Sequence, residues 1–515
     1  ARCDMAAWGV VALLSMAVIH LWLSLRYLSA PLLDLHFFRQ TQTAISTFYM
    51  LREGLTLDYA TPVLGAPWAI PFEFPFYQWA VALFVKATGM ALDPAGRLVS
   101  SVFFWLSLIP CWRLLRRSGL DVGWRCAALA LYLASPLYLY WSRTFMIEST
   151  ALFLGLVFVD LGIKAHERPG LVWTVLACVM GCAASLAKVT TFGVAAAVLL
   201  AFVLQTEVDQ RGAPWRLRLV RLWHVLLMLV MAVAAAVLWT LHTDTLKVAN
   251  PLAGFIVSTS ENMRAWNFGD WAMRASARFW RELFAEDLNR ILGLSWLSLL
   301  ALPTLLLPGR RLLAWGLLAA FVSGPMVFAN LYDVHEYYFY ANGVFVVLLV
   351  SLGLARCATM RWVAPLAVPA LAFALTFMVT SYLTMYQPLL AAAASVTPRF
   401  PEAVTRNTTP GEILLIEGDD WNSLIPYYSD RKAIMDREFL PLDHPDMQAS
   451  LAKTGADKVT ALVVCGNAIT ITSFMTSRIW DLRLSATPCA RIGSCALFVR
   501  PGHCADRGEV QWRMQ

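Results

Sequence analysis

The residues from Pro31 to Ala44, PLLDLHFFRQTQTA, carry several side chains that could do chemistry. Asp34 can accept a proton, His36 can accept or donate one, and Arg39 can bind an anion. Gln42 adds an amide that can hydrogen-bond a hydroxyl. The stretch directly follows the first long apolar run of the chain, and polar groups beside hydrocarbon are costly unless they face water, a partner or a substrate. It therefore predicts the floor of a binding or catalytic site.

Polar side chains also mark the ends of later apolar runs. They are Glu73 in PFEFPFYQW, Arg143 and Glu148 in SRTFMIES, Lys188 in SLAKVTTF, Arg264, Asn267, Asp270, Arg274 and Arg278 in one long loop, and His335, Glu336, Tyr337, Tyr338 and Tyr340 in YDVHEYYFY. Acids, bases and aromatic rings that converge on one face would suit a water-exposed cavity above a bilayer. We expect the loops that hold them to lie on the same side of the membrane.

Some of these residues also have a structural interpretation. Asp34 could cap a helix over 36–52, since Asp is a favoured N-cap residue. Arg39 could be an interfacial anchor. Glu148 stands in a hydrophobic helical start, where an unpaired carboxylate is costly. A purely structural Glu148 therefore requires a partner, and Arg143, about one helical turn away, is the obvious basic residue.

The basic and aromatic residues leave alternatives open as well. Lys188 interrupts an apolar run from 170 to 204, so it either marks the outer membrane boundary or binds an anion. The tyrosines near position 338 could form an interface belt or contact a lipid headgroup or a sugar. His335 and His36 could together bind a metal, but two His residues without further ligands do not indicate one. The sequence thus indicates no certain cofactor, and it leaves a divalent metal open without indicating one.

Composition places the chain among membrane proteins. Of its 515 residues, 59% are hydrophobic and 15% are charged, whereas a soluble protein carries roughly 25% charged residues. The net charge is +7, but the basic residues lie in short loops between apolar runs and form no stripe on a soluble segment. We therefore expect membrane lipids around the chain and no nucleic-acid partner.

The apolar runs predict a mainly α-helical, polytopic membrane protein. After a first run over 5–25, which we expect to be retained rather than cleaved as a signal peptide, further runs fall near 98–115, 124–142, 147–164, 170–187, 190–205, 222–241, 290–307, 312–330, 340–356 and 362–385. Placing the basic clusters between them in the cytoplasm gives about 11 spans, with the polar loops outside. The run over 76–90 contains Lys86 and is short for a span, so we expect a juxtamembrane or re-entrant helix in the first outer loop.

A change of composition after Tyr386 predicts a second domain. Short β-rich runs at 413–416, 461–464 and 495–499 are separated by turn signals, and a helical stretch covers 446–456. We expect a transmembrane catalytic domain over 1–386 and a small periplasmic α/β domain over 387–515. The second domain holds Cys465, Cys489, Cys495 and Cys504, for which an oxidising compartment would allow three pairings that the sequence does not separate.

The ordered set PLLDLHFFRQTQTA, PFEFPFYQW, SRTFMIE, AKVTTF and VHEYYFY resembles the GT-C membrane glycosyltransferases over roughly residues 1–385. It is most similar to the bacterial branch related to protein O-mannosyltransferases and lipid A aminoarabinose transferases. In that branch an acid follows the first helix, a Pro-aromatic motif closes the first outer loop, a second acid follows the third helix, and a Lys begins a later helix. The resemblance implies a bacterial inner-membrane enzyme with its active site facing the periplasm.

The resemblance further implies an inverting transfer, of the EC 2.4 type, from a sugar on a polyprenyl phosphate such as undecaprenyl phosphate to a lipid, glycan or protein acceptor. Asp34 matches the general base, and Glu148 matches a second acid that orients the acceptor or the base. Positive side chains would neutralise the leaving phosphate, namely Lys188 with an arginine of 264–278 such as Arg264 or Arg274. The other expected donor or acceptor contacts are His36, Arg39, Gln42, Glu73, His335, Tyr337 and Tyr338.

One position departs from the pattern. Relatives in the aminoarabinose branch carry a Lys before the Pro pair of the Pro-aromatic motif, where this chain has Glu73. A carboxylate does not bind a phosphate, so either Arg39 or the arginines of 264–278 take over, or the donor lies differently.

Two other functions compete with this expectation. In a transporter or flippase, Glu148 and Lys188 would form a substrate or ion path, but the sequence has no inverted repeat and no pair of Gly/Pro-broken helices in matching halves. An oligosaccharyltransferase or ligase of the same superfamily would move a preassembled glycan. The Trp-Trp-Asp signature of oligosaccharyltransferases is absent, and only Asp419-Asp420-Trp421 comes near it.

Overall fold

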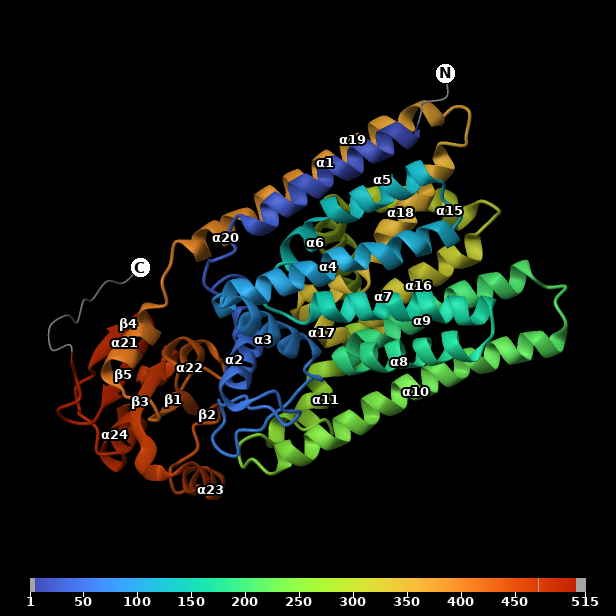
Figure 1. Ribbon diagram of the computed structural model, residues 1–515. Helices are drawn as coiled ribbons and strands as arrows, with labels where there is room; N and C mark the ends of the chain where they lie inside the picture. The colour runs from blue at the N-terminus through green and yellow to red at the C-terminus, as the bar shows by residue number, and fades with distance from the viewer. Residues whose placement is uncertain (1–4, 471, 506–515) are drawn as a thin grey trace. The chain divides into compact units, whose positions relative to one another are not determined.

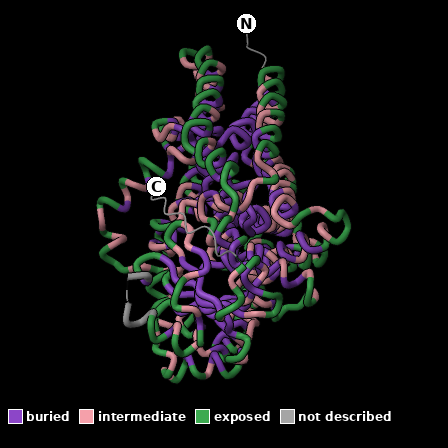
Figure 2. The backbone as a smooth tube through the Cα atoms, turned by 90° about the vertical axis from the view of Figure 1, so that its left-hand side faces the viewer, coloured by how far each residue is buried: buried purple, intermediate pink, exposed green. Residues whose placement is uncertain are grey.

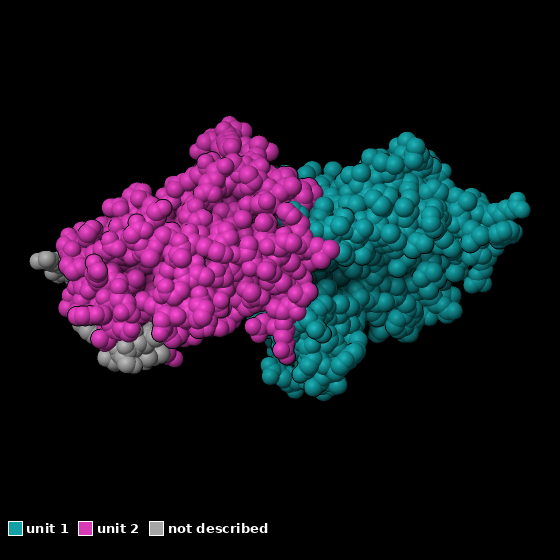
Figure 3. Space-filling model, turned by 90° about the horizontal axis from the view of Figure 1, so that it is seen from below, with its two compact units in different colours: residues 1–29, 96–239, 264–391 teal, residues 30–95, 240–263, 392–515 magenta. Residues whose placement is uncertain are grey.

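A computed structural model describes residues 5–470 and 472–505, and most of the chain is helical (Figure 1). The chain divides into two compact units, which are coloured separately in Figure 3. Unit 1 comprises residues 1–29, 96–239 and 264–391, and unit 2 comprises residues 30–95, 240–263 and 392–515. The first long loop of the sequence therefore folds together with the C-terminal residues.

Unit 1 is a bundle of helices. Its elements are α1 (Met5–Leu25), α4 (Leu92–Arg117), α5 (Val122–Ala134), α6 (Pro136–Trp141), α7 (Glu148–Glu167), α8 (Leu171–Ala187), α9 (Val189–Asp209), the first part of α10 (Trp215–Val248), α11 (Glu261–Phe268), α12 (Trp271–Ala275), α13 (Ala277–Glu282), η2 (Leu283–Asp287), α14 (Leu288–Leu292), η3 (Ser295–Ala301), α15 (Leu302–Leu306), α16 (Arg311–Val327), α17 (Ala329–Val334), η4 (Glu336–Tyr340), α18 (Gly343–Cys357), η5 (Ala364–Leu366), α19 (Ala367–Met385) and α20 (Gln387–Ala394). Helix α7 packs against α8 and α9, α9 against α16, α16 against α18, and α18 against α5.

Several helices have the length and composition of membrane spans. Among the described residues, 6 helices are long and apolar enough to cross a membrane, and a bent helix pair raises the number to 7. Helices α1 and α10 expose most of their apolar residues, since only 17% and 22% of the most apolar stretch of each helix is buried. Figure 2 shows exposed positions in green. An exposed apolar surface of this extent needs lipid around it. The chain is an integral membrane protein, and the number of about 11 spans stays a prediction.

The run over 290–307 does not form the continuous helix that the sequence suggested. The helical segments Ala277–Leu292 and Ser295–Leu306 meet at an angle of 87°. Gly293 lies at the break with φ of 76°, a backbone conformation that favours glycine. A Cβ atom at this position would approach the Cα of Met378 to 2.8 Å. The break between the two helical segments therefore depends on Gly293. The prediction of one continuous helix rested on apolar residues alone and did not consider this glycine.

Unit 2 contains the only sheet of the described residues. Its elements are α2 (Phe37–Glu53), α3 (Phe76–Thr88), the end of α10, η1 (Gly254–Ile256), α21 (Arg399–Asn407), β1 (Ile413–Glu417), α22 (Leu424–Ser429), β2 (Lys432–Asp436), α23 (Pro445–Thr454), η6 (Ala456–Lys458), β3 (Val459–Cys465), η7 (Gly466–Thr470), α24 (Thr472–Asp481), β4 (Ala490–Ile492) and β5 (Cys495–Val499). Strands β1, β3 and β5 and helix α23 confirm the predicted runs. The predicted helix over 76–90 corresponds to α3, which has 13 residues.

The sheet has the strand order β2-β1-β3-β5-β4. Strands β2, β1 and β3 are parallel, and β5 and β4 run antiparallel to their neighbours. All residues of β1 and β3 are buried, as expected for strands covered on both faces. The structure contains one of the three pairings that the sequence left open, with the disulfides Cys465–Cys495 and Cys489–Cys504.

The first long loop is attached to the edge of this sheet. Leu64 forms an antiparallel bridge with Ile434 of β2. The Asn250 side chain at the end of α10 donates to the carbonyl oxygens of Gly65 and Pro67, at 2.9 and 3.1 Å. The loop thus pairs with the edge strand β2, whose backbone groups would otherwise lack partners. These contacts fix the loop that carries Asp34 and Glu73 to the C-terminal sheet.

Candidate active site

Asp34 is a buried acid within unit 2. Its exposed fraction is 5%, and its carboxylate accepts a hydrogen bond from the Gln40 side-chain amide. The N-cap of α2 is His36, with φ of 52° and no side-chain capping bond. The suggested capping role of Asp34 is therefore wrong, because the helix begins at Phe37 and its N-cap position is occupied by His36. What remains is a carboxylate held by a neighbouring amide.

The next turn of α2 faces the Pro-aromatic motif. Arg39 forms an ion pair with Glu73 and also donates to the Gln42 side-chain oxygen. The Tyr59 hydroxyl donates to the carbonyl oxygen of Glu73 at 2.9 Å, which fixes the loop at this point. Because Glu73 balances the charge of Arg39, the pair has no net charge to offer an anion. The unusual carboxylate of the motif thus has a partner in its own loop.

Sequence reasoning missed the role of Trp421 in unit 2. Its ring stacks on Phe72 with centroids 5.5 Å apart, and it meets Phe38 and Phe255 edge-to-face at 5.2 and 5.9 Å. Phe38 and Phe72 directly precede Arg39 and Glu73 in the sequence. Trp421 therefore joins the C-terminal sheet to both sides of that ion pair. The sequence marked it only as part of an incomplete Trp-Asp pattern.

Glu148 and Lys188 form a buried ion pair within unit 1. The Lys188 Nζ lies 2.7 and 2.6 Å from the two carboxylate oxygens, and each residue is 3% exposed. Glu148 is the first residue of α7, and Lys188 is the single residue between α8 and α9. The expected partner, Arg143, instead donates to the carbonyl oxygen of Tyr27. The pairing follows from the packing of α7 against α8 and α9, which sequence spacing does not reveal.

The tyrosines of YDVHEYYFY surround this ion pair. The Lys188 Nζ lies 4.0 Å from the ring centroid of Tyr338 and 5.1 Å from that of Tyr337, within the range of cation–π attraction. The two rings stack on each other, and His335 stacks on Tyr337 at 5.0 Å. The ion pair, the two tyrosines and His335 thus form one cluster, with Tyr337 buried and His335 partly exposed.

The two arginines expected at a phosphate have different surroundings. The Arg274 guanidinium donates to the backbone oxygens of Phe268, Asp270, Met326 and Val327. These bonds satisfy carbonyl groups at the ends of α11 and α16, which is a structural role. Arg264 is exposed and lies in α11. Arg264 therefore remains the better candidate for an anion contact.

A second polar cluster of unit 1 was not expected. Arg290 pairs with Asp287 and, at 2.9 Å, with Glu336 of YDVHEYYFY. Burial raises the pKa of the Glu336 carboxyl above its ordinary value, and Arg290 opposes this shift. Asp287 and Arg290 stand three residues apart just before an apolar run, and this spacing was the available signal. This cluster fixes one end of the loop that carries the tyrosines.

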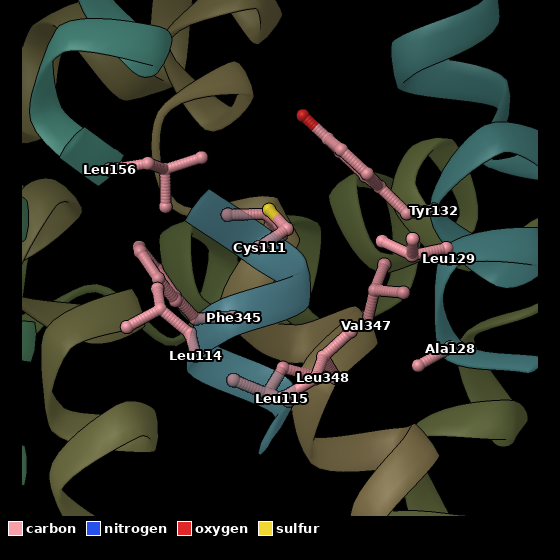
Figure 4. Close-up of a pocket in the computed structure, with 11 residues that line it drawn as sticks. Cys111, Leu114, Leu115, Ala128, Leu129, Tyr132, Leu156, Phe345, Val347 and Leu348 are labelled. Carbon is pink, nitrogen blue, oxygen red and sulfur yellow. The ribbon is translucent and has the colours of Figure 1, made fainter. Parts of the chain in front are cut away.

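A small cavity within the helices of unit 1 is not a substrate site. It has a volume of about 20 Å³ and is lined by Cys111, Tyr132, Phe345 and neighbouring apolar residues (Figure 4). A cavity of this size could hold one water molecule, but water needs polar partners that this lining hardly offers. None of the predicted site residues lines it. We interpret it as a small packing defect.

Across residues 5–470 and 472–505, no group of three or more His, Cys, Asp and Glu side chains is arranged to hold a metal ion. His36 lies at the start of α2 in unit 2, and His335 lies before η4 in unit 1. The suggestion of a metal shared by these histidines therefore gains no support from the geometry.

Solved structures share the overall fold of this chain. Comparison with them shows that the chain has the fold of the GT-C membrane glycosyltransferases, as the ordered motifs suggested. At the identities found, this likeness concerns the fold alone. No protein-family model and no curated protein sequence matches the chain.

Three solved structures illustrate the similarity. ArnT from Cupriavidus metallidurans, a lipid A aminoarabinose transferase, has a TM-score of 0.65 at 12% identity, over 96% of this chain and 99% of ArnT. The oligosaccharyltransferase of Archaeoglobus fulgidus has a TM-score of 0.54 at 12% identity, over 92% of this chain and 71% of its own. The mycobacterial arabinofuranosyltransferase AftD has a TM-score of 0.54 at 14% identity, over 97% of this chain and 40% of its own.

Proposed function

We propose that the protein is an inverting glycosyltransferase that moves a sugar from a polyprenyl phosphate to an acceptor on the outer face of the membrane. The observation that carries the proposal is Asp34, a carboxylate 5% exposed and oriented by Gln40 instead of capping a helix. Two structures of the same fold support the donor class. ArnT was solved bound to undecaprenyl phosphate, and the archaeal oligosaccharyltransferase was solved with a dolichol-phosphate.

In the proposed reaction, Asp34 takes the proton of an acceptor hydroxyl as the hydroxyl oxygen attacks the anomeric carbon of the sugar. The bond between that carbon and the phosphate oxygen breaks, and its electron pair stays with the departing polyprenyl phosphate. Attack opposite the leaving group inverts the configuration of the carbon. The Gln40 amide would hold the carboxylate in the orientation that proton transfer requires.

The departing phosphate gains negative charge, which is the main electrostatic demand of the reaction. We assign the stabilisation of this negative charge to Arg264. The guanidinium of Arg274 already donates to four backbone oxygens, and the charge of Arg39 is balanced by Glu73. Hydrogen bonds from tyrosine hydroxyls would add to its stabilisation. An exposed arginine can change its conformation to meet a phosphate at little cost.

The Glu148–Lys188 pair has a different proposed role. The carboxylate of Glu148 balances the ammonium of Lys188, which lies over the rings of Tyr337 and Tyr338. We assign to the pair the positioning of these tyrosines, whose hydroxyls would hydrogen-bond the phosphate. His36, Gln42 and His335 are assigned to contacts with the sugar or the acceptor.

We further propose that the enzyme lies in a bacterial inner membrane with its site in the periplasm, and that residues 387–515 are the periplasmic domain. The pairing of all four cysteines of this segment supports an oxidising compartment.

Purified full-length protein in nanodiscs tests the proposal, with a panel of radiolabelled sugars on undecaprenyl phosphate and membranes as the source of acceptors. The wild type should transfer one of the sugars, and Asp34→Asn should reduce the rate by about 10²–10⁴-fold. Asp121→Asn is the matched control, because this substitution removes the same charge from a residue whose side chain caps α5. Full activity of Asp34→Asn would exclude Asp34 as the base.

A further inference from the structure

A basic pocket lies at the C-terminal ends of α4 and α7, away from Glu148. It has a volume of about 420 Å³ and is lined by Arg113, Arg116, Arg117, Lys164 and Arg168 together with Asp160 and Glu167. Five positive and two negative side chains leave an excess of three positive charges. All seven residues belong to unit 1. We name this hollow the α4–α7 pocket.

The two acids of the α4–α7 pocket are already paired. Asp160 is buried and accepts hydrogen bonds from Arg113, at 2.9 Å, and from Arg117. Glu167 lies 3.4 Å from the Nε of Arg117. In the part of the chain that the structure describes, no carboxylate pairs with Arg116 or Arg168, and both are exposed. The pocket therefore has a rigid, ion-paired base and two arginines that carry uncompensated charge.

An apolar surface adjoins the pocket. Lys164 Nζ lies 3.2 Å from the ring centroid of Trp173 on α8. The same end of α8 exposes Leu171 at 79% and Val172 at 64%. Because α7 has the length and composition of a membrane span, its end lies at the depth of the lipid headgroups. A positive hollow thus stands beside a surface suited to acyl chains, a combination that suits a lipid better than a free anion.

We propose that the α4–α7 pocket binds the phosphate headgroup of an anionic phospholipid, with the acyl chains along the exposed face of α8. Arginines bind phosphate oxygens through paired N–H donors, and basic pockets beside membrane helices on the cytoplasmic side are suited to such headgroups. The positive-inside rule places the arginine-rich end of α4 on that side. The site is separate from the proposed transfer of a sugar and does not depend on it.

Native mass spectrometry of the full-length protein in detergent tests this site, with cardiolipin and phosphatidylglycerol as probes and phosphatidylcholine as the neutral comparison. Arg116→Gln with Arg168→Gln removes two of the three excess positive charges and leaves the pairs of Asp160 intact. We expect the wild type to retain anionic lipid and the double variant to bind it about tenfold or more weakly, with no change for phosphatidylcholine. Arg211→Gln with Arg216→Gln, two exposed arginines outside the pocket, should bind as the wild type does.

Two results would overturn the proposal. One is equal retention of anionic lipid by the wild type and the Arg116/Arg168 double variant. The other is displacement of the lipid by millimolar inorganic phosphate, which would identify a site for a free anion instead. If the glutamine variant does not fold, Arg116→Lys with Arg168→Lys keeps the charge but loses the paired donors, and it should show intermediate retention.

Discussion

The buried pair of Glu148 and Lys188 allows a quantitative test of how unit 1 is held together. Glu148→Gln would leave the ammonium without its carboxylate, and Lys188→Met would leave the carboxylate without its ammonium. The two side chains are only 2% and 4% exposed, and their charged atoms lie 2.6 Å apart. Removing one partner of such a pair typically destabilises a protein by about 3–5 kcal/mol, because the other charge stays buried.

The double variant Glu148→Gln with Lys188→Met should recover most of this loss, since no charge remains to be compensated. If each single variant loses about 3–5 kcal/mol and the double variant only about 1 kcal/mol, a double-mutant cycle should give a coupling energy of about 5–9 kcal/mol. Unfolding of the purified full chain by titration with sodium dodecyl sulfate, followed by circular dichroism, measures each variant. The matched control is Glu282→Gln, which breaks the exposed pair of Arg278 and Glu282 and should change stability very little.

Activity separates a structural role of the pair from a functional one. If the pair only stabilises the fold, the double variant should recover both stability and sugar transfer. We expect it to recover stability but not transfer, because the tyrosines lose the ammonium over their rings. Single variants as stable as the wild type would refute the burial argument, and full activity of the double variant would refute the positioning role.

Three further outcomes are expected. Burial and the neighbouring Asp436 carboxylate raise the pKa of Glu417 to about 9 from an ordinary 4.5, against the opposing charge of Arg478. Because the folded chain then holds a proton that the unfolded chain releases, the free energy of unfolding should fall between about pH 5 and 9 by up to about 1.4 kcal/mol per pH unit. Hydrogen exchange of β1 measures this slope, and Glu417→Gln should abolish it. Non-reducing peptide mapping should find Cys465–Cys495 and Cys489–Cys504, and Cys489→Ser with Cys504→Ser should cost about 3 kcal/mol for the 15-residue loop. Trp421→Ala should lower the rate of sugar transfer about tenfold or more by displacing Phe38 and Phe72, whereas Trp421→Phe should retain most of the activity. The control variant Trp480→Ala, at an 82% exposed position, should have no effect on the rate.

Much of the fold follows from local sequence signals. Long apolar runs identify the helices that could span a membrane, and short β-rich runs between turn signals identify β1, β3 and β5. Strand β2 was not predicted, because KAIMD has only three apolar residues between charged ones. Its place in the sheet comes from pairing with β1, which is a tertiary effect. The break at Gly293 was missed for a related reason, since a run of apolar residues does not show where another helix requires a close approach.

The candidate site could be predicted as a set of residues but not as a set of pairs. Asp34, Glu148 and Lys188 stand out because charged side chains beside apolar runs need a reason. Their partners depend on contacts between segments far apart in the chain. Glu148 meets Lys188 rather than Arg143, and Glu73 meets Arg39 across the first loop. Trp421 was not selected at all, because its neighbours come from three other segments.

The central claim is that this chain transfers a sugar from a polyprenyl phosphate, with Asp34 as the base. Mass spectrometry of surface glycolipids and glycoproteins, from a strain lacking the protein and from the same strain complemented with wild type or Asp34→Asn, tests it most directly. We predict that one component loses the mass of one sugar in the deletion strain, that the wild type restores it, and that Asp34→Asn, present in the membrane at the same level, does not. Identical profiles in all strains, or restoration by Asp34→Asn, would contradict the claim.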